Sequence, residues 1–129
     1  MIKRIAMWSG PRNISTAIMR SFESRGDTFV SDEPMYGHFL SNSTIEHPYK
    51  KEVILSMETN RKKLRKYLSE YNPVGYTIWY QKQMSHHILD NDNLHWIKRL
   101  ENVFLIRNPK DVILSYIKKF KLDDEHLIG

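Results

Sequence analysis

Four short, largely apolar runs constrain the fold of this chain more than any other feature. They are residues 5–8, 28–31, 76–80 and 103–106, and each ends in a polar turn. We expect a strand in each run, because apolar character without clean alternation is typical of strands buried on both faces. Helical segments follow the strands. This order predicts an α/β fold, a doubly wound parallel sheet of about four strands with helices on both faces.

The segments between the runs carry apolar residues at helical spacing. The spacing predicts a helix over residues 14–22 and a long helix over residues 50–71, whose middle could be bent or broken. Residues 35–48 are predicted to be a loop. A last helix begins at Pro109. We expect its buried stripe to consist of Val112, Ile113, Tyr116, Ile117 and Phe120.

Polar residues follow every predicted strand. They are the loop at residues 9–16, the pair Asp32 and Glu33, the segment 82–87, and Arg107. In doubly wound sheets ligands bind outside the carboxyl ends of the strands, so the functional site is predicted at this edge. Adjacent residues of a strand point to opposite faces. We therefore do not expect the carboxylates of Asp32 and Glu33 to act together.

The first of these loops has the composition of a phosphate- or sulfate-binding site. Its candidate binding residues are Gly10, Arg12, Asn13, Ser15 and Thr16. Unpaired N–H groups and the positive end of the helix dipole favour an anion at such a turn. A triphosphate-binding loop needs a Gly-Lys pair where this chain has Ser15 and Thr16. The alternative is a plain polar turn with Ser15 as the helix cap.

Composition limits the partners of the chain. Its 129 residues suffice for one domain, and the net charge of +5 suits an anionic ligand. The absence of cysteine fits a cytoplasmic location, and the histidines lack metal-ligand spacing, so no metal is expected. No apolar run reaches the length of a membrane span. The basic runs at residues 61–66 and 118–121 are interpreted as solvated helix faces, so no nucleic acid is expected. The oligomeric state stays open.

Two motifs resemble those of the sulfotransferases that use 3′-phosphoadenosine 5′-phosphosulfate (PAPS). Residues 106–116 look like their 3′-phosphate-binding motif, in which Arg, Pro, Asp-Val and Ser-Tyr recur at this spacing. The first loop looks like their 5′-phosphosulfate loop, with Pro11 and Arg12 where many members have Pro-Lys. Residues 8–22, 32–34 and 81–87 are similar to bacterial-type sulfotransferase-like P-loop proteins. The resemblance implies a three-layer α/β sandwich.

The resemblance also implies the reaction and the residues that bind the donor. A sulfuryl group would pass from PAPS to a hydroxyl or amine of a small-molecule acceptor. The 5′ end of PAPS would be held by Arg12, Asn13, Ser15 and Thr16, with Gly10 allowing close approach. Arg107 and Ser115 would hold the 3′-phosphate. The alternative for Arg107 is an ion pair with Asp111.

Transfer also needs positive charge and a base. Lys82 and Arg12 are the candidates for the charge. Many sulfotransferases have a base histidine two residues after this lysine, but here that residue is Met84. Some bacterial members resemble this chain in having a glutamate after the second strand, so Glu33 is preferred and His87 is second. The alternatives are an ion pair of Glu33 with Arg12 or a helix N-terminus, and a packed and an exposed histidine at residues 86–87.

The chain ends soon after the 3′-phosphate motif, at Gly129. Because complete sulfotransferases continue with further helices, we expect residues 1–129 to be a single domain of a truncated member that lacks its C-terminal part. Activity of this short chain is therefore open. A non-catalytic nucleotide- or anion-binding module of the same fold is the alternative. A small-molecule kinase ranks third, because the loop lacks the lysine that such chemistry uses.

Overall fold

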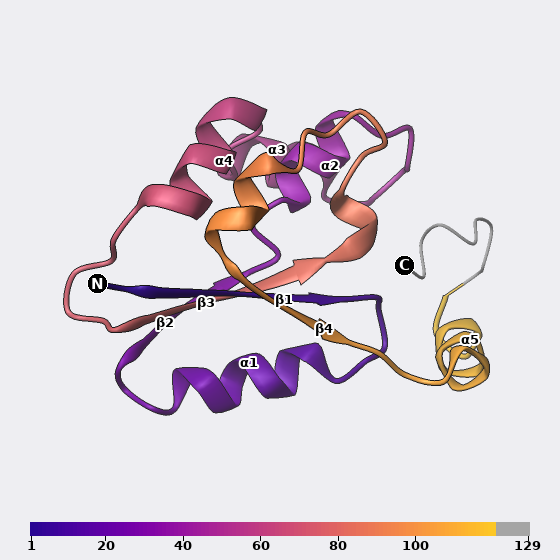
Figure 1. Cartoon of the computed structure of the whole chain (residues 1–129). Coiled ribbons are helices and arrows are strands. Elements are labelled where there is room, and N and C mark those ends of the chain that lie inside the picture. The colour runs from indigo at the N-terminus through magenta and orange to yellow at the C-terminus, as the bar shows by residue number, and fades with distance from the viewer. Residues whose placement is uncertain (121–129) are drawn as a thin grey trace.

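The structure is a computed structural model that describes residues 1–120. Four parallel strands form its sheet in the order β2-β3-β1-β4, namely β1 (Lys3–Ser9), β2 (Thr28–Asp32), β3 (Ile78–Met84) and β4 (Glu101–Leu105). Helix α1 (Ser15–Glu23) covers one face of the sheet, and the helices between β2 and β3 lie over the other (Figure 1). The predicted α/β fold with helices on both faces of a parallel sheet is confirmed.

The strand register brings all four carboxyl ends to one edge of the sheet. Ser9, the last residue of β1, is level with Met84 of β3 and Leu105 of β4. On the other side of β3, Asp32 at the end of β2 is level with Lys82. The polar segments that follow the strands therefore start from neighbouring points.

The segment predicted as one helix over residues 50–71 forms two helices, α3 (Lys50–Ser56) and α4 (Arg61–Glu70). The break lies in the middle of the predicted helix, where the sequence allows a bend. Asn60 favours a new helix start there, because its side chain accepts a hydrogen bond from the backbone N–H of Lys63 at 3.1 Å.

The loop predicted over residues 35–48 is wrong in its first half, where α2 (Tyr36–Ser41) forms a helix. Gly37 lets α2 approach the segment between α3 and α4 closely. A Cβ atom at this position would lie 2.6 Å from the Cβ of Met57. The helix is therefore set by tertiary packing, which local periodicity does not reveal.

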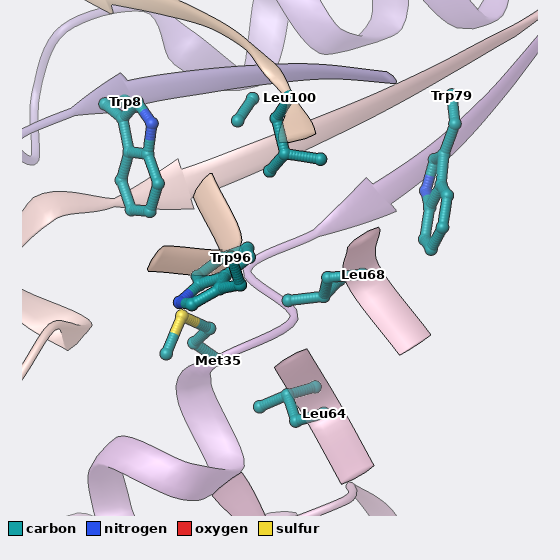
Figure 2. Close-up of a cluster of buried hydrophobic side chains, with 8 residues drawn as sticks. Trp8, Met35, Leu64, Leu68, Trp79, Trp96 and Leu100 are labelled. Carbon is teal, nitrogen blue, oxygen red and sulfur yellow. The ribbon is translucent and has the colours of Figure 1, made fainter. Parts of the chain in front are cut away.

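The larger hydrophobic core fills the space between the sheet and α4. Figure 2 shows Leu64 and Leu68 on α4, with Trp79 extending towards them from the sheet. The buried members of this core are Ala6, Trp8, Met35, Leu64, Leu68, Trp79, Trp96 and Leu100. A smaller core of Met7, Met19 and Tyr80 lies on the opposite face, against α1. Both sides of strands β1 and β3 are therefore covered.

Strand β3 extends beyond the predicted run at residues 76–80 into a polar sequence. Gln81 is fully buried and donates from Nε2 to the carbonyl oxygen of Leu68 at 2.8 Å. Gln83 in turn donates from Nε2 to Gln81 at 3.1 Å. Because these amides find partners inside the protein, a polar sequence can continue a central strand.

Strand β4 and α5 (Pro109–Ile117) are less covered than the rest. Helix α5 follows β4 and lies away from the other helices (Figure 1). Of the predicted buried stripe only Val112 is buried, while Ile113, Ile117 and Phe120 are exposed and Tyr116 is half-buried. Phe104 in β4 is 70% exposed. The prediction of a buried stripe is wrong because no element within residues 1–120 packs over this side. Lys121, the end of the second basic run, lies outside the described residues.

Candidate functional site

The first loop, residues 10–14, holds its backbone in an unusual conformation between β1 and α1. Arg12 and Ile14 have φ angles of 64° and 55°, in the left-handed region that residues with a Cβ rarely occupy. Ile14 is the N-cap residue of α1, and no side chain caps the helix. The alternative in which Ser15 serves as the cap is therefore not observed. Strained residues of this kind cluster at functional sites.

Arg12 joins this loop to the segment that follows β4. Its Nε atom donates a hydrogen bond to Oγ of Ser115 at 3.0 Å, and its carbonyl oxygen accepts one from Nη1 of Arg107 at 2.8 Å. We call these three residues the arginine cluster. The structure thus brings together residues predicted to hold opposite ends of the donor, although they lie 95 and 103 positions apart.

The two guanidinium groups of the arginine cluster have only neutral oxygen atoms as partners in the described part of the chain. The alternative ion pair between Arg107 and Asp111 is not formed there, and neither is a pair between Arg12 and Glu33. Two positive charges without a carboxylate partner attract an anion. Arg107 also keeps N–H groups that could form the paired hydrogen bonds typical of arginine and phosphate.

A second group of charged residues lies at the ends of β2 and β3. The Nζ atom of Lys82 is 2.8 Å from Oδ1 of Asp32 and 2.8 Å from Oε1 of Glu33. We call these three residues the carboxylate–lysine cluster. The lysine side chain is buried, whereas both carboxylates are partly open to solvent. The one positive charge of Lys82 thus faces two carboxylates, and the cluster as a whole carries one negative charge in excess.

The expectation that Asp32 and Glu33 point apart is wrong. Glu33 has a φ angle of 46°, which takes it out of the strand conformation directly after β2. Strand alternation therefore ends at Asp32, and both carboxylates reach the same ammonium group. A left-handed residue right after a strand is a local conformation that a periodic pattern does not predict.

Burial and the two carboxylates act in opposite directions on Lys82. Desolvation of the side chain lowers the pKa of Lys82, whereas the hydrogen bonds and charges of Asp32 and Glu33 raise it. The carboxylates prevail, and the pKa is raised above its ordinary value. Lys82 therefore remains a cation at neutral pH.

The histidine pair lies against aromatic side chains of α2. His87 is 1% exposed, and its ring stacks on Tyr36 and Phe39 with centroid distances of 5.1 and 4.9 Å. Burial lowers the pKa of His86 to about 4 and that of His87 to about 3. The neighbouring Lys82 also disfavours a charged His87. The alternative of one packed and one exposed histidine is not observed, because neither ring is exposed.

A pocket of about 520 Å³ opens beside the first loop, on the side of β1 and β4. Its volume is in the range of small-molecule sites, roughly 300–1,000 Å³. Its apolar walls include Trp8, Ile88, Ile97 and Phe104, and its polar lining comes from Ser9, Asn13, Ser85 and Arg107. The carboxylate–lysine cluster does not line it. The pocket therefore joins the first loop to Arg107.

Several of these residues carry no functional signal in the sequence. Phe104 belongs to an apolar run predicted as a strand, and only the fold places it, together with Ile97, at the pocket wall. Asp32 was set aside because of strand alternation. Tyr36 lay in a predicted loop. The aromatic residues that follow Glu33 are the one local signal that could have pointed to α2 as part of the site.

The comparisons with known proteins define the class. A sequence model of the family described as "Sulfotransferase domain" matches residues 3–127. The chain belongs to this sulfotransferase domain family, as the resemblance of its two motifs predicts. No solved structure matches the chain significantly.

Two curated relatives come from Arabidopsis thaliana. "Branched-chain-amino-acid aminotransferase-like protein 1" is 37% identical over 114 residues, and "branched-chain-amino-acid aminotransferase-like protein 2" is 34% identical over 114 residues. Each match covers 88% of this chain but 20% of the relative. The chain thus spans about a fifth of the length of the curated relatives that it matches.

No group of three or more His, Asp or Glu side chains within residues 1–120 is placed to hold a metal ion. None of the helices in that range combines the length and apolar character that a bilayer span requires.

Proposed function

We propose that this protein transfers a sulfuryl group from PAPS to a hydroxyl or amine of a small-molecule acceptor. The observation that carries the proposal is the direct contact of the first loop with Arg107 and Ser115. A ligand with phosphate groups on both the 5′ and 3′ positions of one nucleoside would satisfy both parts of the arginine cluster. A cytoplasmic location belongs to the same proposal and is supported by the absence of cysteine.

The residues at the strand ends fit the two phosphate-bearing ends of the donor. Arg107 and Ser115 would hold the 3′-phosphate. The first loop and the start of α1, with Gly10, Arg12, Ser15 and Thr16, would hold the 5′ end through backbone N–H groups, hydroxyl groups and the Arg12 charge. The pocket that the first loop and Arg107 both line would take the nucleoside. The donor supplies an activated sulfuryl group, so the chain needs to supply orientation, charge and a base.

Glu33 fits the role of base better than His87. The Glu33 side chain is partly open to solvent, whereas His87 is closed in by Tyr36 and Phe39. Because burial lowers the pKa of His87 to about 3, its neutral imidazole has little affinity for a proton at neutral pH. Glu33 would take the proton of the acceptor hydroxyl while the acceptor oxygen forms its bond to sulfur and the sulfur–oxygen bond to the 5′-phosphate breaks.

Lys82 would respond to this proton transfer. In the structure its charge is shared by Asp32 and Glu33. Once Glu33 is protonated, Asp32 alone faces the ammonium group, and more of the Lys82 charge can act on the sulfuryl oxygens. Lys82 and Arg12 would then stabilise the negative charge that spreads over the transferred group.

One observation favours a non-catalytic module as the second candidate. Met84, which stands where many sulfotransferases have the base histidine, is buried and accepts a hydrogen bond on Sδ from Ser9 Oγ at 3.9 Å. This position is therefore structural. A kinase is disfavoured by the first loop, which lacks the lysine of triphosphate sites.

Calorimetric titration with adenosine 3′,5′-bisphosphate and, separately, with ATP and magnesium tests the proposal. We expect the bisphosphate to bind with the higher affinity and Arg107→Ala to weaken it. Preference for ATP with magnesium would contradict donor binding. Turnover of labelled PAPS with a panel of hydroxyl and amine acceptors then separates enzyme from binding module. Loss of turnover in Glu33→Gln, with bisphosphate affinity retained, is expected. Full turnover in Glu33→Gln and loss in His87→Ala would overturn the base assignment.

A further inference from the structure

Asn13 has a buried acceptor atom without a partner. Its side chain donates from Nδ2 to the carbonyl oxygen of Leu105 at 3.3 Å. Because a carbonyl oxygen can only accept, this contact fixes which end of the amide is the nitrogen. Oδ1 points elsewhere and has no hydrogen-bond partner among the described residues, although Asn13 is only 7% exposed. A buried acceptor left without a partner needs an explanation, and for a residue that lines a pocket a bound ligand can supply one.

Asn13 is part of the lining of the 520 Å³ pocket beside the first loop. The two serines that share this lining have partners, since Ser85 Oγ donates to the carbonyl oxygen of Ser9 and Ser9 Oγ donates to Met84 Sδ. Of the polar side chains in this lining, Arg107 supplies the cation, and Asn13 Oδ1 is the buried acceptor that has no partner within residues 1–120. The matching ligand has a hydrogen-bond donor close to an anionic group, on a body that tolerates apolar walls.

The contacts of Arg107 place its guanidinium group at the backbone of the residue that precedes Asn13. Arg107 donates to the carbonyl oxygen of Arg12, the residue directly before Asn13. A phosphate held by Arg107 would thus have the Asn13 acceptor as a near neighbour. In a ribonucleoside 3′-phosphate the 2′-hydroxyl group sits on the carbon beside the phosphate, and it can donate a hydrogen bond.

We propose that Asn13 Oδ1 accepts a hydrogen bond from the ribose 2′-hydroxyl of the nucleotide, and so selects ribonucleotides over deoxyribonucleotides. This inference rests on the proposed function, because it assumes that Arg107 holds the 3′-phosphate. It changes the role predicted for the Asn13 side chain. One N–H of Nδ2 is used by Leu105, and the unpartnered Oδ1 is an acceptor like the phosphate oxygens, so this atom suits a donor group better than the 5′-phosphate.

The decisive comparison uses the unaltered protein and two ligands that differ by one oxygen atom. Calorimetric titrations with adenosine 3′,5′-bisphosphate and with its 2′-deoxy analogue should give dissociation constants that differ about tenfold, the effect of one buried hydrogen bond. The 2′-O-methyl analogue, which keeps the oxygen but cannot donate, should bind as weakly as the deoxy form. Equal affinity for the ribose and deoxyribose forms would overturn the inference.

Two variants test whether the preference for the ribose form arises at Asn13. Asn13→Ala should bind the ribose and deoxyribose forms equally, and Ser85→Ala, which alters the same pocket, should keep the tenfold difference. Inosine 3′,5′-bisphosphate tests whether Asn13 contacts the base instead, and a loss confined to that ligand would contradict the ribose contact. If no bisphosphate binds the unaltered protein, the proposed function itself is wrong. If both bind equally, only the ribose assignment is wrong.

Discussion

The carboxylate–lysine cluster and the arginine cluster lie at the same edge of the sheet but handle positive charge in opposite ways. Lys82 is buried and bonded to two carboxylates at 2.8 Å. Arg12 and Arg107 have only a hydroxyl and a carbonyl oxygen as partners within residues 1–120. The comparison shows that the number of cations in a region is a poor guide to whether it binds an anion. What matters is which cations lack an anionic partner in the protein itself.

This contrast predicts that variants of the two clusters separate stability from ligand binding. Changes on the side of Lys82 and His87 should alter the free energy of unfolding more than the affinity for nucleotide. Changes in the arginine cluster should do the reverse. Arg107→Ala and Lys82→Met test that separation directly, and the histidine pair and Ile14 test the stability of the two regions.

Acid should destabilise the protein through the histidine pair. The unfolded chain takes up protons on His86 and His87 below a pKa of about 6.5, whereas burial lowers the folded pKa values to about 4 and about 3. The stabilising contribution is therefore complete above pH 6.5 and is lost as the pH falls towards these folded values. From pH 7 to pH 5 each ring should cost about 2 kcal/mol of unfolding free energy.

Urea denaturation at the two pH values measures this loss. The variant His87→Phe, which keeps an aromatic ring between Tyr36 and Phe39, should remove about half of the acid sensitivity. His95→Phe, at a position where the sequence has another histidine but no comparable packing, is the matched control. The same pH dependence in His87→Phe as in the unaltered protein would show that His87 is not held neutral.

Arg107→Ala should weaken binding of adenosine 3′,5′-bisphosphate by about 10- to 100-fold, because hydrogen bonds to charged groups are worth about 1.5–3 kcal/mol. Its unfolding free energy should change by less than about 0.5 kcal/mol, since the residue is exposed. Calorimetry and urea denaturation measure the two effects. Lys110→Ala, an exposed cation three residues along, is the control and should keep the affinity. A similar loss in both variants would mean that only the overall charge matters.

Lys82→Met should show the opposite behaviour. Removing the ammonium group leaves Asp32 and Glu33 facing each other, and because both are partly open to solvent we expect a loss of only about 1–2 kcal/mol. Bisphosphate affinity should change less than twofold. Chemical denaturation and calorimetry check this. Adding Asp32→Asn and Glu33→Gln to Lys82→Met should recover part of the stability, and a tenfold loss of affinity in Lys82→Met would break the contrast.

Ile14→Gly should give the smallest effect and a gain. Ile14 has a φ angle of 55° and is 71% exposed, so its side chain adds strain without packing in the core. Glycine adopts this conformation freely, and relief of the strain should outweigh the greater freedom of the unfolded chain by about 0.5–1 kcal/mol. Thermal unfolding measures it. Ile18→Gly, within α1, should destabilise instead. A loss in both variants would indicate that the Ile14 side chain makes a contact needed for the fold.

The fold class, and the sheet edge that carries the candidate site, can be predicted from the sequence because both depend on patterns that every strand repeats. Runs of apolar residues with helices between them define a parallel sheet, and such a sheet has its ligand site at one edge. The two motifs around Arg12 and Arg107 name the family. These features are local in sequence or follow from topology.

Features that depend on contacts between distant residues could not be predicted. The left-handed conformation of Glu33, which joins it to Asp32 on Lys82, has no signature in a strand pattern. The burial of Gln81 needs the carbonyl oxygen of Leu68 on α4. The exposure of α5 could not be predicted either. Periodicity shows that one face of the helix is apolar, but it does not show whether another element covers that face.

The strand order has a consequence for how the protein assembles during synthesis. Of the four strands in residues 1–120, β1 is made first, yet its partners there are β3 and β4, and Lys3 can pair only once Ile78 has been made. In the same part of the chain, β2 pairs with β3 alone. No two strands of the sheet can therefore pair until residues 78–84 have left the ribosome. Such distant pairing slows folding and leaves the apolar β1 uncovered in the nascent chain. The strand that provides Lys82 is thus the one on which the sheet assembles.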